Sequence, residues 1–475
     1  MSPTSIRALA LLALCSSAAS AERLEPLHRG RSPTQPRLKS SAPGAQATLP
    51  SRVPRDGAKA ARNAPLLALA APRAAPSFRW ALLHNWLYFL SLGLSVPNLP
   101  RVISSIVNED GSVGVTSASI KVSGDVETVD KALTFLGVGF LCALSDVTGR
   151  RALMAWSALG YGLTCLLQAT CRSSVRALFL ADFIDGISSC MSPVCQAYVT
   201  DASPPDRRVV NLGIFQGLSI GGAFIIAFPL GGVLGKQLGP RVPIYVAAAA
   251  QLLNLLLILL VTPESSPAAA RAGRKLDLRT ANPFGALKKL FGGTPLLRSA
   301  SATYFLVTLA RGVLDAQFSN YALYRFGWGP QESGPLLVLV GLMLAVAPRL
   351  VVPRLGLLRS ILWGTLLFAF GQTATAFAPT PARFVGSIFL SSVGCACIPA
   401  LVALIVEQGG QSERGALLGG LGSLQELCGA LGNPLYSRLF AYFISDAAPM
   451  KLPGAQFLAS AAFLLLAFGV SLSFV

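Results

Sequence analysis

Ionisable side chains occur inside stretches of sequence that are otherwise apolar, and their chemistry requires a function or a partner. A charged group near the centre of a bilayer costs roughly 2.5–3.5 kcal/mol on insertion scales, so each is a functional candidate. A carboxylate in such a place can carry a proton or bind a polar solute. The residues are Asp130, Lys131, Asp182, Asp185, Arg311, Asp315 and Glu426.

The spacing of these groups ranks them. Arg311 and Asp315 are four residues apart and can neutralise each other on one helical face, so a structural ion pair is one interpretation. The other takes Asp315 as a coupling acid, because side chains that can hydrogen-bond a small polar solute follow it. These are Gln317, Asn320, Tyr321 and Tyr324. We adopt the second interpretation as the prediction for this segment.

Other polar residues in apolar stretches are weaker candidates. Asp182 and Asp185 are three apart, which would favour a shared proton, but they stand near the outer end of their stretch, where solvent exposure is expected. Gln216 and Asn254 are single amides, and single amides also join helices. His84 is expected at a headgroup or in a hydrogen bond between helices.

A charged motif, CALSDVTGRR, separates two apolar stretches at residues 142–151. Its glycine permits a tight turn and its arginines suit the headgroup region, so a basic turn is the plainest explanation. Asp146, however, would end the preceding helix, where an acid is unfavourable to the helix dipole. It should pair with Arg150, Arg151 or a neighbouring helix N-terminus, in a cluster that can lock one conformation and open in another.

Membrane helices are the elements that must position these residues. Hydrophobic residues make up 53% of the 475 positions and charged residues 13%, more apolar surface than a soluble fold of this length can bury. The apolar runs are continuous and do not alternate, which excludes a membrane β-barrel. Twelve stretches are long enough to cross a hydrocarbon core of about 30 Å. They are 80–97, 126–144, 152–170, 176–200, 210–235, 242–261, 296–323, 333–352, 359–378, 383–406, 415–444 and 455–475.

The two halves of the chain echo each other. Gly149 and Gly356 lie 207 residues apart between equivalent stretches, and Arg207 with Gly213 recurs at the same offset as Arg414 with Gly420. This predicts a duplicated six-helix unit, at 80–262 and 296–475, with a substrate site between the halves. The central loop, 263–295, contains NPFGALKKLF, either a short helix on the membrane surface or a solvated connector. Basic residues fall in alternate loops, which places both termini on the side of Gly149.

The first 79 residues differ from the remainder. They carry twelve basic residues against three acids, half of the net charge of +18. Residues 1–21 look like a secretory signal, and residues 22–79 like a disordered, transit-like basic tail. The pair resembles the bipartite leader of algal plastid proteins, which predicts a plastid membrane. The alternative is a basic tail at the cytosolic face of an endomembrane or the plasma membrane, near anionic lipid.

Other function classes find no support. The two histidines, His28 and His84, stand far apart, and the sequence has no phosphate-binding glycine loop and no clustered metal ligands. We therefore expect no enzyme, no catalytic residue, no metal and no cofactor. Nucleic-acid binding is excluded because the basic tail has no aromatic residues between its arginines. The cysteines, mostly in apolar stretches, are expected to be small buried residues.

The motif GFLCALSDVTGRR, residues 139–151, resembles the signature loop between the second and third helices of the major facilitator superfamily. AYVTDASPPDRR (197–208), TPES (262–265), NPFGALKK (282–289) and LCGALGNPLY (427–436) resemble the tetracycline-resistance-like branch, and most of all its hippocampus-abundant-transcript group. The resemblance implies the twelve-helix fold of that superfamily. It also implies a gating charge cluster, whose matching residues here are Asp146, Gly149, Arg150, Arg151 and Asp201.

Two departures from the family pattern argue against drug/proton antiport inherited from the exporters. The fourth stretch has ADFIDG where the exporters carry an arginine, and the fifth has AFPLGG with its proline displaced. We expect a monomeric carrier that moves a small solute by rocking its two halves, coupled to protons through Asp315. The alternatives are a uniporter for a sugar-like or organic-anion solute, and a membrane receptor or scaffold that has lost transport.

Overall fold

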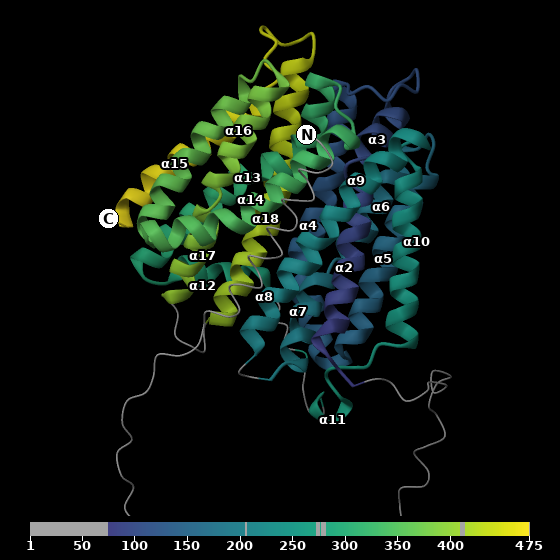
Figure 1. Cartoon of the computed structure of the whole chain (residues 1–475), viewed down its shortest axis with the longest axis vertical. Coiled ribbons are helices and arrows are strands. Elements are labelled where there is room, and N and C mark those ends of the chain that lie inside the picture. The colour runs from purple at the N-terminus through teal and green to yellow at the C-terminus, as the bar shows by residue number, and fades with distance from the viewer. Residues whose placement is uncertain (1–74, 205–206, 272–275, 277–281, 409–413, 475) are drawn as a thin grey trace, which may run out of the picture. The chain divides into compact units, whose positions relative to one another are not determined.

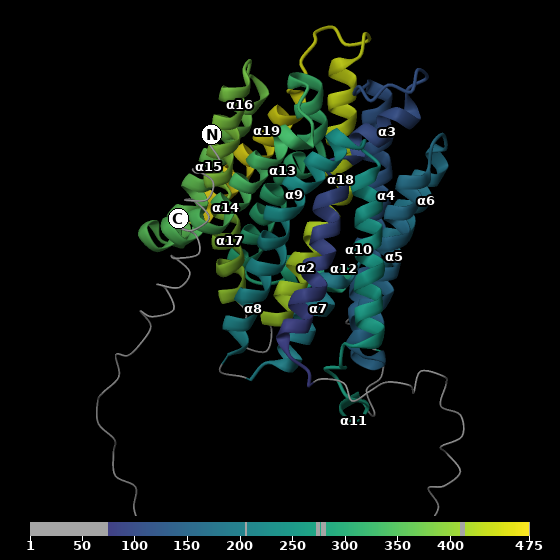
Figure 2. The ribbon, with the colours of Figure 1, turned by 45° about the vertical axis from the view of Figure 1, so that its right-hand side comes forward.

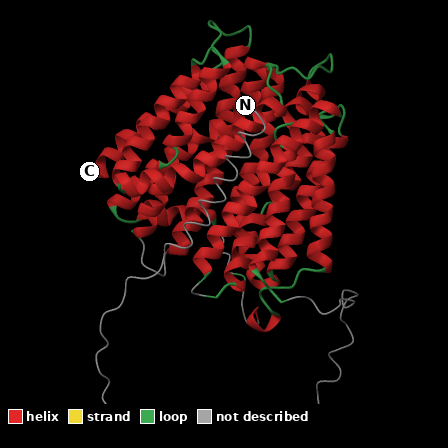
Figure 3. Ribbon diagram, viewed as in Figure 1, coloured by secondary structure: helices red, strands yellow, loops and turns green. Residues whose placement is uncertain are grey.

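The computed structural model describes residues 75–204, 207–271, 276, 282–408 and 414–474. Over these ranges the chain forms helices joined by turns and loops, without a strand (Figure 3). The predicted all-α class is confirmed. The leader prediction for residues 1–21 and most of the tail 22–79 lies outside the described residues.

Helices occupy each of the first six predicted stretches. The bounds are α2 (Phe78–Ser95) and α3 (Leu99–Val107), α4 (Ser117–Thr148), α5 (Arg150–Thr170), α6 (Val175–Ser188) and α7 (Met191–Ala202), then α8 (Arg208–Gln216), a π-helical turn (Gly217–Gly221) and α9 (Gly222–Gln237), and finally α10 (Val242–Leu260). The helices α2 and α3 meet at a bend of 45°. Pro97 lies in this break, as expected for a residue that cannot donate a backbone hydrogen bond.

The last six predicted stretches are also helical. Their bounds are α13 (Pro295–Phe326), α14 (Pro330–Leu355), α15 (Leu357–Ala376), α16 (Pro381–Gly394) and α17 (Cys397–Glu407), α18 (Arg414–Ile444) and α19 (Ala455–Ser471), followed by a short 3₁₀ turn (Leu472–Phe474). By length and composition alone, seven helices of the described part are apolar enough to cross a membrane, or eight if α2 and α3 form one span. The predicted count of twelve is consistent with the helices found.

The second span begins earlier than its hydropathy indicates. Helix α4 starts at Ser117, nine residues before the predicted stretch, because Thr116 and Ser119 form a capping box. The Thr116 hydroxyl accepts from Ser119 N at 3.2 Å, and Ser119 Oγ accepts from Thr116 N at 2.9 Å. These bonds satisfy backbone donors that have no partner at a helix N-terminus. The longer helix adds Asp125 to the acids Glu127 and Asp130 of the predicted stretch.

Gly149 and Gly356 form equivalent turns. Each is the C-cap of one helix and the N-cap of the next, between α4 and α5 and between α14 and α15. Their φ angles are +108° and +78°, a region that residues with a side chain rarely adopt. The repeat seen in the sequence therefore corresponds to a repeated turn in the structure.

The two halves lie side by side, purple to teal and green to yellow in Figures 1 and 2. Helix α4 packs along α18, and α9 packs along α14. Each half has its own apolar core, one around Tyr198 and Phe215, the other around Phe368 and Leu401. Large apolar side chains cover the exposed faces, as lipid contact requires. Examples are Leu252, Leu260, Trp363, Phe370 and Leu466.

The central segment contains a helix that packs against the bundle. α12 (Pro283–Gly292) begins where Asn282 accepts a hydrogen bond from Phe284 N at 2.9 Å, and it contacts α4, α13 and α18. The Phe284 ring meets Phe135 of α4 edge to face, with 5.6 Å between centroids. Leu290 is fully buried. Of the two alternatives for NPFGALKKLF, the structure supports the helix, while its place on a membrane surface stays a prediction.

Candidate transport cavity and charge cluster

A cluster of charged residues surrounds the Gly149 turn. Arg150, at the start of α5, is buried although it carries a charge. Its Nη2 lies 2.6 Å from Asp146 Oδ1 at the end of α4, and its Nε lies 3.0 Å from Asp201 Oδ2 near the end of α7. Its Nη1 donates to Ser145 Oγ at 2.6 Å. The planar guanidinium, with five donors, thus joins the ends of three helices.

Glu264, which the sequence analysis quoted within TPES but gave no role, belongs to the same cluster. Its two carboxylate oxygens accept from the backbone N–H groups of Arg150 and Arg151 at 3.0 and 3.1 Å. A carboxylate at this position satisfies free donors of α5 and stabilises its positive dipole end. Arg271 donates to the carbonyls of Val147 and Thr148, at the end of α4. The central segment therefore fastens both sides of the turn.

The Arg151 side chain contacts the end of α10. Its Nε donates to the Ile258 carbonyl at 2.7 Å, and its Nη2 donates to the Leu259 carbonyl. These carbonyls end α10, where a cation is favourable to the helix dipole. Of the five predicted cluster residues, the structure gathers Asp146, Arg150 and Asp201 around the Gly149 turn, and it directs the Arg151 guanidinium toward α10.

A cavity of about 160 Å³ lies between the halves. Helices α2, α3, α4, α5 and α6 line one side, and α13 lines the other. Its polar and charged lining residues in the described part are Tyr88, Ser95, Ser123, Glu127, Asp130, Lys131, Tyr161, Gln168, Asp182, Asp185, Ser189, Asp315, Ser319 and Asn320. Acids thus outnumber bases among these residues.

Several predicted candidates meet in or beside this cavity. Lys131 Nζ lies 2.8 Å from Asp130 Oδ2. Asp315 lines the cavity and its Oδ2 lies 3.6 Å from Arg311 Nε, so the ion pair considered for these two residues is present. Asn320 also lines the cavity and donates to the buried Gln317 at 3.5 Å.

Three other candidates lie away from the cavity, whereas Glu426 lies near Lys131 of its lining. Tyr321 is buried in an aromatic cluster of the C-terminal half, with its ring 4.9 Å from that of Phe457. Tyr324 is partly exposed beside Phe440. Gln216 is exposed at the end of α8. Glu426 is half-buried on α18, one turn before Gly429, which packs against the Lys131 side chain.

The expectation that the acids of α6 face solvent is wrong for Asp182, and Asp185 is half-buried. Asp182 is only 8% exposed and accepts from Gln168 Nε2 at 2.9 Å, and both acids line the cavity. The reason is the approach of α6 to α4 at Gly186, where an added Cβ would lie 2.9 Å from the Asp130 carbonyl. Sequence analysis also missed Glu127. Glu127 could have been predicted from its position three residues before Asp130, because residues at this spacing share one helical face.

His84 joins helices, as one of its two predicted roles requires. Its Nδ1 lies 2.7 Å from Asn254 Oδ1 of α10, and its Nε2 lies 2.7 Å from Thr262 Oγ1. The ring is fully buried. Asn254, one of the two amide candidates, is thus hydrogen-bonded to His84 and lies outside the lining of the cavity.

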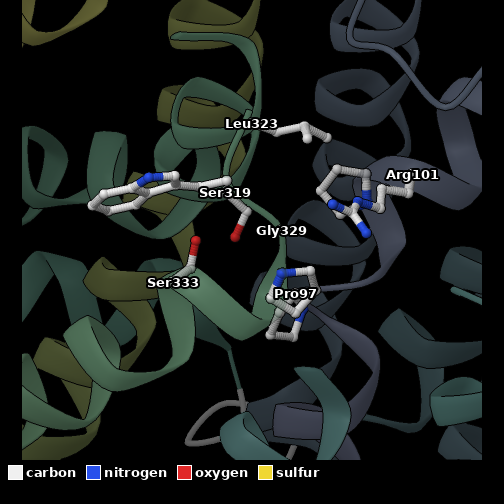
Figure 4. A pocket seen from close by; sticks show the side chains of 9 residues that line it. Pro97, Arg101, Ser319, Leu323, Gly329 and Ser333 are labelled. Carbon is white, nitrogen blue, oxygen red and sulfur yellow. The ribbon is translucent and has the colours of Figure 1, made fainter. Parts of the chain in front are cut away.

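Contacts between the halves gather toward one end of the cavity. Arg438 Nη2 lies 3.1 Å from Asp125 Oδ1, Ser117 Oγ donates to the Ala441 carbonyl at 2.8 Å, and Lys236 lies 3.8 Å from Glu332. A small pocket of about 10 Å³ adjoins the cavity there and shares Ser319 with it. Figure 4 shows Arg101 reaching toward Gly329, with Ser319 and Ser333 on the opposite side. This end is opposite the Gly149 turn, because α4 runs from Ser117 to Thr148.

Comparison with known proteins decides the family. Residues 81–359, more than half of the chain, match the model of the Major Facilitator Superfamily. The chain belongs to the major facilitator superfamily. This facilitator is 24% identical to bovine (Bos taurus) hippocampus abundant transcript-like protein 1 over 420 residues, covering 83% of this chain and 80% of that protein. It is 26% identical to the class C tetracycline resistance protein of Escherichia coli over 356 residues, covering 74% and 86%.

Solved structures agree on the fold of this facilitator. The human organic anion transporter MFSD10 (TETRAN) superposes with a TM-score of 0.61 at 22% identity, covering 83% of this chain and 99% of that one. The nucleoside transporter NupG gives a TM-score of 0.62 at 14% identity, covering 83% and 98%. The resemblance inferred from the motifs is therefore confirmed. The chain is an integral membrane transporter for a small molecule, with the homology and fold of proteins that are not enzymes.

Proposed function

We propose that this protein is a secondary active transporter that moves a small solute by alternating access and is coupled to protons. The observation that carries the proposal is the acidic cavity between the halves, with contacts across the two halves toward one of its ends. A carrier of this kind exposes one midplane site to each face in turn, by rocking one half against the other. We propose that it acts as a monomer, with residues 80–262 and 296–475 as the two rocking units.

The charge cluster is the proposed lock at the other end. Arg150 holds the ends of α4, α5 and α7 together within the N-terminal half. The Asp146 side chain remains 49% exposed, so it can take a further partner when the C-terminal half closes on this face. The cluster would then be the bistable element that alternating access needs.

Asp315 is the proposed coupling acid. It lines the cavity from α13, and its Arg311 partner stands at 3.6 Å, a distance at which a proton or a charged solute can compete for the carboxylate. We expect the Asp315→Asn variant to lose the pH dependence of solute flux, because the amide cannot take up a proton. Asp110→Asn, the same change in an exposed loop, is the control.

The measurement is uptake into liposomes containing the purified protein, with phenethylamine, glucose and phenylacetate as labelled probes and an imposed pH gradient. Full transport by Asp315→Asn with unchanged pH dependence would contradict coupling at this residue. Wild-type flux that does not respond to the pH gradient would favour the second candidate, a uniporter whose paired charges, Asp130 with Lys131 and Arg311 with Asp315, only stabilise the fold. A complete absence of flux for all probes would favour the receptor or scaffold alternative.

The membrane in which the protein resides is a separate proposal. We propose a plastid membrane, reached through a leader formed by residues 1–79, in preference to an endomembrane or the plasma membrane. This proposal rests on the composition of residues 1–79 alone. Residues 1–79 fused to a fluorescent protein in an algal cell with a secretory route to its plastid should direct the fusion to that plastid. Retention in another membrane would contradict the proposal.

A further inference from the structure

The cavity has more acidic than basic side chains. Among the described residues that line it, Glu127, Asp130, Asp182, Asp185 and Asp315 are acids and Lys131 is the one base. Lys131 is already engaged, because its Nζ lies 2.8 Å from Asp130 Oδ2. The nearby Arg311 is paired with Asp315. Within the described part of the chain, neither Asp182 nor Asp185 forms an ion pair, and Asp182 accepts a hydrogen bond from Gln168.

The two acids of α6 are oriented for a ligand. Asp182 is more than nine-tenths buried and uses one oxygen to accept from Gln168. Asp185 Oδ1 is buried without a hydrogen-bond partner in the described part of the chain. A buried carboxylate oxygen without a partner is costly, so it indicates a donor that binds there during function. Three residues of spacing put both carboxylates on one face of α6.

Aromatic rings line the same cavity. Tyr88 of α2 and Tyr161 of α5 stand with ring centroids 5.0 Å apart. The Tyr161 hydroxyl lies 2.8 Å from Ser95 Oγ, which holds its ring in place. The face of such a ring attracts an organic cation. A cavity of about 160 Å³ is comparable to an engineered cavity of about 150 Å³ that binds benzene.

We propose that the transported solute is a small organic amine, bound as its cation between Asp182 and Asp185 with its apolar part against Tyr88 and Tyr161. This inference rests on the proposed transport function and names its substrate class. An organic anion would meet an excess of carboxylates and would need Lys131, which Asp130 already holds. A neutral sugar would leave the two acids of α6 without a counter-charge.

Binding to the purified full-length protein in lipid nanodiscs tests the inference without requiring transport. Three probes of nearly equal shape differ in charge: phenethylamine is a cation, 2-phenylethanol is neutral, and phenylacetate is an anion. We expect calorimetry to give a dissociation constant for phenethylamine at least about tenfold lower than for the other two. A tenfold change corresponds to about 1.4 kcal/mol.

Substitutions assign the binding to these residues. Asp182→Asn and Asp185→Asn keep the side-chain size and remove the charge, and each should weaken phenethylamine binding tenfold or more. The same variants should change 2-phenylethanol binding by less than twofold. Asp110→Asn in an exposed loop should leave all three dissociation constants unchanged. The melting temperature of each unliganded variant shows whether it is folded, and removal of a charge without a cation partner should not lower it.

The inference would be overturned if phenylacetate or 2-phenylethanol bound as tightly as phenethylamine or more tightly. It would also be overturned if phenethylamine binding were undetectable, or if Asp185→Asn left it unchanged. The two proposals can fail separately. Flux of phenylacetate or glucose into liposomes, without amine binding, would support transport and contradict an amine substrate. Amine binding without flux of any probe would support the binding site and contradict transport.

Discussion

Gly149 and Gly356, 207 residues apart, make the same turn in different surroundings. Both have a positive φ, and each ends one helix and begins the next. An added Cβ at Gly149 would lie 2.5 Å from Glu264 Oε2, whereas at Gly356 nothing of the described protein lies within 4 Å. The pair therefore separates the effect of backbone strain from the effect of the contact with Glu264.

Alanine at either glycine should destabilise the protein, and more at Gly149. Backbone strain of this kind costs on the order of 1–3 kcal/mol at each position. Gly149→Ala must also displace the Glu264 carboxylate from the start of α5. We expect its melting temperature to fall further than that of Gly356→Ala, measured in the same detergent. Equal losses would mean that Glu264 contributes nothing at this turn.

Removal of the Glu264 carboxylate should loosen the Gly149 turn. Glu264→Ala deletes the acceptor for the N–H groups of Arg150 and Arg151, and loss of such a helix cap costs about 0.5–2 kcal/mol. Thermal unfolding should detect the loss, and Glu109→Ala, in an exposed loop, is the control. Glu264→Gln should recover part of the stability, because its amide oxygen still accepts a hydrogen bond. Wild-type stability of Glu264→Ala would show that the cap is dispensable.

Arg150 should not tolerate replacement by lysine. An ammonium keeps the charge but lacks the planar fork that reaches Asp146, Asp201 and Ser145 together. We expect Arg150→Lys to reduce flux into liposomes at least tenfold. Arg208→Lys, at the exposed first residue of α8, should transport normally. Full flux by Arg150→Lys would mean that the cluster needs only a positive charge at this position and not a guanidinium.

The contact between Asp125 and Arg438 should influence conformation more than stability. Both side chains are well exposed, so the pair is worth about 0–1 kcal/mol. Arg438→Ala should shift the two-state balance toward opening at this end, which a maleimide probe at a cysteine replacing Ser123 of the cavity can detect. The exchanged pair, Asp125→Arg with Arg438→Asp, should restore slow labelling. No change in labelling for Arg438→Ala would contradict a role in closure.

Gly186 should be intolerant of alanine because its neighbour is backbone. An added Cβ would stand 2.9 Å from the Asp130 carbonyl and 3.2 Å from its Cα, and neither can move aside without shifting α4. Gly186→Ala should lower the melting temperature and weaken phenethylamine binding together. Gly137→Ala, on α4 with nothing within 4 Å, should keep or raise the melting temperature, since alanine favours a helix. If Gly186→Ala changed neither the melting temperature nor phenethylamine binding, α4 and α6 would not need to pack this closely.

The motifs predicted local features well. Helices were predictable because a bilayer leaves backbone groups no partners except their own. The turns at Gly149 and Gly356 were predictable because a positive φ favours glycine. Asp146, Arg150 and Asp201 were recognisable as a cluster through the family motif. The start of α4 at Ser117 was missed, because its capping box lies in a polar stretch that hydropathy ignores.

Contacts between helices could not be predicted from the sequence. Tyr321 follows Asn320, yet successive residues point about 100° apart on a helix, so one faces the cavity and the other an aromatic cluster. Glu264 and Arg150 are 114 positions apart, and no local pattern joins them.

By itself the sequence determined the all-α class, the duplicated turn and most of the charged residues inside apolar stretches, because these depend on composition and on local backbone preference. Only the tertiary structure decided which charges share one cavity and which acids form ion pairs. That outcome depends on which helix faces meet, as where Gly186 lets α6 approach α4 and bury Asp182.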